Sequence, residues 1–211
     1  MPTVATSWPD SPATNDYYNP KSNWGLSGND IRHRLVVSAL YELPLGHGKK
    51  FAPGSAVVNQ VIGGWSFGTI AELHTGTPLS PLDAVNNTGS FSDGVRPNLV
   101  GNPVLSSDHR TAAQWFNTAA FQQNPAYTFG NAPRTFGSGP GTTQVDASLL
   151  KNFHVYEGTN LQFRAEALNV LNHGNWANPN TLFGSALFGK VTGLQTGNQS
   201  RIVQLALHLE F

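Results

Sequence analysis

Five stretches of this sequence alternate between apolar and polar residues. The alternation is clearest in the last stretch, where the apolar positions are Val203, Leu205, Leu207, Leu209 and Phe211. Successive side chains of a β-strand point to opposite faces, so this pattern is typical of a strand with one apolar and one polar face. It predicts strands over about residues 33–44, 57–75, 143–156, 161–172 and 200–211.

The segments that connect the predicted strands fall into two length classes. The connections over about residues 45–56 and 157–160 are short and contain turn-forming residues such as Gly, Pro and Asn. The connections over about residues 79–140 and 173–200 are long and rich in Asn and Gly. A loop as long as 79–140 is unusual in a compact soluble domain. We therefore expect antiparallel, up-and-down strands joined by alternately short and long connections.

Three features favour a membrane barrel over a soluble sheet. Outer-membrane barrels combine short periplasmic turns with longer extracellular loops. Residues 203–211 form a strand of nine residues, and a tilted membrane-crossing strand needs about 9–11. Aromatic side chains lie near likely membrane interfaces, with Tyr41 before the Pro44 turn, Trp65 after the turn that follows, and Phe211 at the end; such rings favour the lipid headgroup zone. The sequence thus predicts an all-β barrel in a Gram-negative outer membrane, with extracellular long loops.

The predicted strands are too few to close a barrel, because the smallest membrane barrels have about eight. An open sheet edge in hydrocarbon would leave backbone groups unpaired. We therefore expect either that the chain is one part of a larger barrel or that several copies close one together. Truncation is the simpler explanation, because the sequence opens with loop-like residues and lacks the apolar run of a signal peptide.

Several motifs, taken in their order and spacing, resemble the C-terminal end of TonB-dependent outer-membrane receptors. The likeness is greatest to the Oar-like subgroup, which carries an N-terminal carboxypeptidase-regulatory-like domain. It extends from about Asn15 onward, and its motifs are Asp30-Ile31-Arg32-His33-Arg34-Leu35, Gly63-Gly64-Trp65-Ser66, Gly76-Thr77-Pro78, Val145-Asp146-Ala147-Ser148-Leu149-Leu150-Lys151-Asn152-Phe153, Phe163-Arg164-Ala165-Glu166-Ala167-Leu168-Asn169-Val170-Leu171-Asn172-His173 and Arg201 to Phe211.

The resemblance implies a barrel of about 22 strands with an N-terminal plug. It also implies import of a bulky nutrient, energised by a periplasmic partner, and gives Phe211 a role as the signal read by the outer-membrane assembly machinery. The 211 residues contain no plug, no partner-binding box and no regulatory-like domain. We therefore expect that the partner acts through other N-terminal parts and that this fragment is not transport-competent alone.

Composition removes several other function classes. Charged residues make up 11% of the chain and its formal net charge is zero, so nothing steers a nucleic acid toward it. The absence of cysteine excludes disulfides and thiolate metal sites. The seven histidines are scattered, with no HxH or HxxxH spacing, so we expect no metal site. No nucleophile stands in a GxSxG-type setting, so we expect neither an enzyme nor a cofactor.

Four polar residues fall on the polar faces of the third and fourth predicted strands: Asp146, Ser148, Arg164 and Glu166. Asp146, Arg164 and Glu166 could be misread as a catalytic constellation, but charge pairing across neighbouring strands is the favoured explanation. In a barrel these faces line the lumen. We therefore interpret the four residues as lumen-facing, with an ion-pair network across the strands.

The long predicted loop is rich in aromatic residues, namely Phe91, Trp115, Phe116, Phe121, Tyr127, Phe129 and Phe136. Binding residues concentrate on loops, which makes Trp115, Phe116 and Tyr127 candidates for ligand contact. The favoured interpretation is that the aromatic rings pack the loop on itself or over the barrel mouth.

An alternative fits the same alternation of residues. In a soluble or surface β-sandwich with a binding or adhesion role, the apolar faces of two sheets would pack against each other. Such a protein would be a folded monomer without detergent, whereas a barrel would not.

Overall fold

The computed structural model describes residues 15–16, 18–46, 48–51, 55–92, 94–156 and 159–210. The chain divides into two compact units. The sheet unit comprises residues 34–74, 142–174 and 197–211, and the loop unit comprises residues 1–33, 75–141 and 175–196. In chain order, the predicted strands belong to the sheet unit and the long connections belong to the loop unit.

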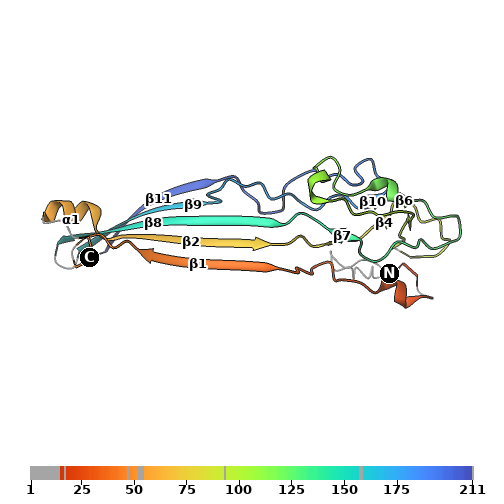
Figure 1. Ribbon diagram of the computed structural model, residues 1–211, viewed down its shortest axis with the longest axis horizontal. Helices are drawn as coiled ribbons and strands as arrows, with labels where there is room; N and C mark the ends of the chain where they lie inside the picture. The colour runs from red at the N-terminus through yellow and green to blue at the C-terminus, as the bar shows by residue number, and fades with distance from the viewer. Residues whose placement is uncertain are drawn as a thin grey trace, which may run out of the picture. The chain divides into compact units, whose positions relative to one another are not determined.

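The sheet unit is a single five-stranded antiparallel sheet in the order β1-β2-β8-β9-β11. Figure 1 shows these strands side by side. Their bounds are β1 Arg34–Glu42, β2 Trp65–His74, β8 Thr142–Tyr156, β9 Thr159–Leu168 and β11 Ile202–Glu210. The antiparallel order confirms the all-β fold class that the alternation predicts.

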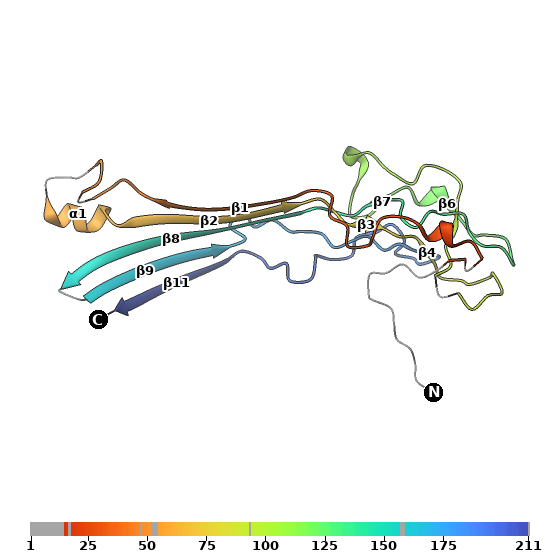
Figure 2. The same cartoon turned by 90° about the horizontal axis from the view of Figure 1, so that it is seen from below.

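One predicted strand is partly wrong. Residues 57–62, expected to begin the second strand, form the helix α1, Ala56–Ile62, and β2 begins only at Trp65. The apolar residues Val57, Val58, Val61 and Ile62 follow the spacing of one helix face and do not alternate. Gly63 and Gly64 then separate helix from strand, and Gly64 adopts a positive φ of 68°, which glycine tolerates without strain. Figure 2 shows α1 at the end of the sheet where β2 begins.

The register of the strands gives the sheet one apolar and one mainly polar face. Paired residues of antiparallel strands share a face, so Tyr41 lies beside Phe67 and Phe163 beside Leu207. Up to the register irregularity at His154 and Tyr156, the odd-numbered strand residues share the apolar face and the even-numbered residues share the other. Among these described residues, only Thr and Lys151 interrupt the apolar face. Apart from the position of Lys151, the described structure leaves much of the apolar face uncovered: Leu207 is 69% exposed.

The loop unit has little regular structure. Its strands have two residues each and pair as β3 Pro78–Leu79 with β7 Gly137–Ser138, β5 Asn98–Leu99 with β6 Phe121–Gln122, and β4 Leu82–Asp83 with β10 Leu182–Phe183. Its 3-10 helices are η1 Pro20–Asn23, η2 Ser107–His109 and η3 Thr118–Ala120. Among the described residues, no helix of either unit has the length and apolar character needed to cross a bilayer.

An aromatic core holds the loop unit together. The ring centroid of Phe116 lies 4.9 Å from that of Phe136, 5.0 Å from Phe188 and 5.8 Å from Phe121, all in edge-to-face contact. Edge-to-face packing is favourable because the positive edge of one ring meets the negative face of another. Phe188 comes from residues 175–196, so the core joins the two long connections into one unit.

Candidate ligand pocket and the polar sheet face

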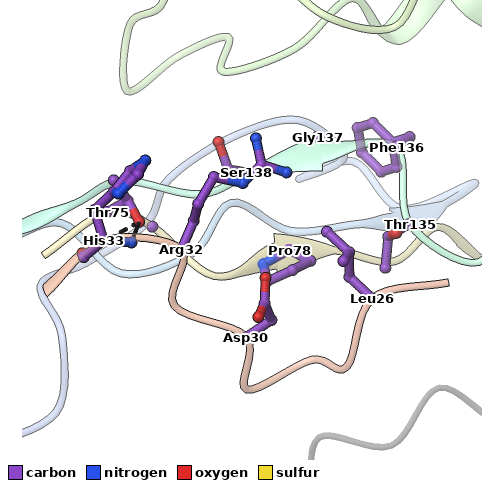
Figure 3. Close-up of a pocket in the computed structure, with 11 residues that line it drawn as sticks. Leu26, Asp30, Arg32, His33, Thr75, Pro78, Thr135, Phe136, Gly137 and Ser138 are labelled. Atoms are coloured by element: carbon purple, nitrogen blue, oxygen red, sulfur yellow. Dashed lines mark hydrogen bonds between the residues drawn. The ribbon is translucent and has the colours of Figure 1, made fainter.

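A pocket of about 530 Å³ opens in the loop unit (Figure 3). This volume lies within the usual range of small-molecule sites. Three segments line the pocket, through Leu26, Asp30, Arg32, His33, Thr75, Gly76, Pro78, Thr135, Phe136, Gly137 and Ser138.

Backbone hydrogen bonds hold the walls of the pocket in place. The amide of Thr75 donates to the carbonyl oxygen of His33 at 3.0 Å, and the amide of His33 donates to Oγ1 of Thr75 at 3.2 Å. On the other wall, β3 and β7 pair, and Gly76 lies directly against the Gly139 carbonyl, where a Cβ would clash. The pocket is therefore a preformed feature of the loop unit.

The pocket combines charged, hydroxyl and apolar groups. Arg32, His33 and Asp30 supply a cation, an imidazole and a carboxylate, and the apolar wall includes the ring of Phe136. Within the described structure neither Arg32 nor Asp30 belongs to an ion pair. A pocket with an apolar wall and converging polar groups suits an organic ligand, or one part of a larger ligand, that carries polar or charged substituents.

A second charged feature of the loop unit is structural. Arg96 is buried, and its Nη2 donates to the carbonyl oxygen of Ser22 at 2.8 Å. Arg134 donates through Nη1 to the carbonyl oxygen of Asn23 at 2.8 Å. Burial and the nearby charge of Arg134 lower the pKa of Arg96 from its usual value, although arginine stays protonated in proteins. The two guanidiniums tie residues 22–23 to the rest of the loop unit.

The three predicted ligand-contact aromatics do not come together. Phe116 is 2% exposed at the centre of the aromatic core, which gives it a packing role. Trp115 is half-buried, and its indole Nε1 donates to the carbonyl oxygen of Ser138, a pocket residue, at 2.9 Å. Tyr127 is 84% exposed and adopts a positive φ of 61°. Ligand contact by Trp115 and Tyr127 stays a prediction.

The pocket itself was not predicted from the sequence. Arg32 and His33 stood in a motif that carried the family resemblance, but not among the candidate binding residues. Their convergence with Ser138 depends on contacts between segments that are about a hundred residues apart, which no local pattern records.

The four predicted polar residues of β8 and β9 do share one face of the sheet. The register pairs Ser148 with Glu166, and Arg164 with Leu150. A hollow of about 380 Å³ on the sheet includes Asp146, Ser148 and Glu166 in its lining. Whether this face lines a lumen stays a prediction.

The expected network of ion pairs across these strands is wrong. Arg164 Nη2 bonds Glu166 Oε1 at 2.6 Å along its own strand, because its neighbours across the sheet, Leu150 and Ala206, carry no charge. Asp146 instead accepts hydrogen bonds from the amide of Asn169 and from Gln144 Nε2, both at 2.8 Å. Its role within the described structure is therefore to hold the end of β9.

Among the residues that the structure describes, no group of three or more His, Asp or Glu side chains is arranged to hold a metal ion. Phe211, the predicted assembly signal, lies outside the described residues.

Comparison with protein families decides the class of protein. A family model described as an outer membrane beta barrel domain matches residues 3–204, nearly the whole chain. The chain belongs to this family. No curated protein and no solved structure matches it.

Membership in the outer-membrane barrel family agrees with the sheet. It places the protein in the outer membrane, and the antiparallel strands with one exposed apolar face are those of such a barrel. The β-sandwich alternative is not favoured, because the five long strands of the described structure form a single sheet, with no second large sheet packed on its apolar face.

Proposed function

We propose that this barrel domain is the C-terminal part of a TonB-dependent receptor of the Oar-like subgroup, which takes up a bulky nutrient. The observation that carries the proposal is the preformed pocket of the loop unit, lined by Arg32, His33 and Asp30. The sequence motifs that resemble those receptors support the same assignment.

Chain topology supports an extracellular position for the loop unit. Because the strands are antiparallel, the residues before β1, the connection from β2 to β8 and the connection from β9 to β11 all join the same end of the sheet. The connection from β1 to β2, which contains α1, and the connection from β8 to β9 join the opposite end. In outer-membrane barrels the long loops are extracellular and the short turns periplasmic, so the pocket would meet ligands from outside the cell.

In this proposal the two faces of the sheet lie in different surroundings. The apolar face, with Leu205 and Leu207, faces lipid, and the polar face, with Asp146, Ser148, Arg164 and Glu166, faces the lumen. The outer strands β1 and β11 pair with further strands beyond these five, because unpaired backbone groups in hydrocarbon cost several kcal/mol each. The 211 residues then form one part of a larger barrel, whose energising partner acts through other parts.

A growth experiment tests nutrient uptake. Cells that lack the gene are complemented with the wild type, with Arg32→Ala or with Lys190→Ala, an exposed cation of the loop unit outside the pocket. Each strain grows on a panel of single limiting nutrients. We expect that the deletion strain, the Arg32→Ala strain and cells without the energising partner all grow poorly on one of these nutrients. The Lys190→Ala strain should grow normally on the same nutrient.

Two results would contradict this function. Normal growth of the deletion strain on every nutrient would remove the uptake role. If the deletion strain grows poorly on a nutrient but cells without the energising partner grow normally on it, uptake does not depend on that partner. The protein would then be an outer-membrane pore and not a TonB-dependent receptor.

A further inference from the structure

The helix α1 has the composition of a membrane-surface segment. Its sequence, AVVNQVI, contains no charged residue. Val57 is 73% exposed, Val61 is 61% exposed, and Val58 is exposed beside them. These three side chains lie on one side of the helix by their spacing. A short helix with such an exposed apolar side is not stabilised in water by burial of that side.

Two side chains of β8 and β2 bind the C-terminal end of α1. Lys151 donates from Nζ to the carbonyl oxygens of Gln60, at 2.8 Å, and of Gly63. Trp65 donates from its indole Nε1 to the carbonyl oxygen of Val61 at 3.1 Å. Lys151 and Trp65 are paired in the register and both lie on the apolar face of the sheet. The helix is therefore attached on the side of the apolar face.

The attachment suits surroundings of low polarity. The last carbonyl oxygens of a helix have no partner within the helix, and leaving them unpaired is costly away from water. Here an ammonium group and an indole supply the missing donors. Lys151 is 1% exposed, and its Nζ lies 4.7 Å from the ring centroid of Phe153. Lys151, the one charged side chain that the described strands place on the apolar face, is thus hidden beneath the end of α1.

The adjoining turn has the residues of a lipid interface. Gly46, in the turn after β1, lies directly against Gly63 at the end of the helix. This turn presents an exposed Phe51, with the ammonium of Lys50 at 5.6 Å from the ring centroid. Basic and aromatic residues beside an apolar helix side are typical of segments that lie in the headgroup zone of a membrane.

We propose that α1 lies on the lipid surface at the short-connection end of the barrel, with Val57, Val58 and Val61 inserted among the lipids. The occupant of this exposed side is membrane lipid, because α1 continues the apolar face of a sheet that belongs to an outer-membrane barrel family. The inference rests on the proposed orientation of that face toward lipid.

Spin labelling tests the position of α1. The chain contains no cysteine, so single variants Val57→Cys and Val61→Cys can be labelled with a nitroxide in the full chain in outer membranes. Leu207→Cys reports on the apolar face and His208→Cys, its neighbour in β11, on the polar face. The measurement is the ratio of collisions with oxygen, which enriches in lipid, to collisions with a water-soluble nickel chelate.

The outcomes separate this inference from the proposed function. We expect the labels at Val57, Val61 and Leu207 to collide mainly with oxygen and the label at His208 to collide mainly with nickel. Nickel-dominated collisions at Val57 and Val61, with Leu207 still in lipid, would place α1 in water and overturn the inference alone. Protection of both valine positions from both reagents would assign the surface to a protein contact and overturn it too. A water-exposed Leu207 would overturn the lipid orientation of the sheet itself.

Discussion

The sheet unit and the loop unit differ in how far they bury their apolar side chains. Every buried apolar side chain in the described structure belongs to the loop unit, with Phe116 at its centre. In the sheet unit, apolar side chains of the outer strands, such as Leu205 and Leu207, are exposed. The loop unit is thus built like a small water-soluble domain, although it is poor in regular structure. The sheet unit is built for surroundings that are themselves apolar, as family membership requires.

Phe116→Ala should have the largest effect, because it removes a ring from the centre of a closed core. We expect a loss of about 3–5 kcal/mol in the stability of the loop unit, as for other buried phenylalanines. Hydrogen exchange at Val100, whose amide donates to Ala120 at 2.8 Å, measures this loss. Phe91→Ala is the control, since Phe91 is fully exposed and should change stability by less than about 0.5 kcal/mol. If Phe116→Ala and Phe91→Ala change stability equally, Phe116 does not lie in a closed core.

Leu207→Arg tests the apolar face of the sheet unit. A charge on the lipid face near the middle of a strand costs about 2–4 kcal/mol, and we expect this loss in the free energy of folding into bilayers. His208→Arg is the matched control, because His208 is the next residue of β11 and lies on the polar face. Its cost should be clearly smaller. If both substitutions are tolerated equally, the two faces do not differ in their surroundings.

Lys151→Met tests how the sheet unit accommodates Lys151, the one charged residue that the described strands place on the apolar face. The carbonyl oxygens of Gln60 and Gly63 lose a donor, so we expect α1 to loosen by about 1–3 kcal/mol. Faster hydrogen exchange at Gly63, whose amide closes the helix on Asn59, reports the loosening. Lys49→Met removes an exposed ion pair with Glu42 instead and should leave this exchange rate unchanged. An unchanged rate in Lys151→Met would show that the ammonium does not hold the helix.

The ion pair between Arg164 and Glu166 should contribute least. Both side chains are more than a third exposed, and exposed pairs contribute about 0–1 kcal/mol. A double-mutant cycle with Arg164→Met and Glu166→Gln, read from folding into bilayers, measures the coupling. A coupling well above about 1 kcal/mol would mean that the pair lies in surroundings of low polarity, contrary to a water-filled lumen.

Local patterns predicted some of these features and missed others for physical reasons. Alternation located all the strands of the large sheet, because a strand that separates two different surroundings must alternate. It failed over residues 57–62, where a short apolar run precedes two glycines and α1 forms instead. The partner of Arg164 was also missed, since a strand pattern shows which face a residue occupies but not which neighbour its long side chain reaches.

By itself, the sequence determined the approximate positions of the five long strands, their antiparallel order, the apolar and polar faces, and the outer-membrane class, because all of these follow from a local repeat or a linear motif. Only the tertiary structure decided how residues 79–140 and 175–196 share an aromatic core, how Arg32 and Ser138 come to line one pocket, and how Lys151 binds the end of α1. Each of these features joins residues far apart along the chain. Such contacts follow from packing and hydrogen bonding in three dimensions, and they leave no periodic pattern in the sequence.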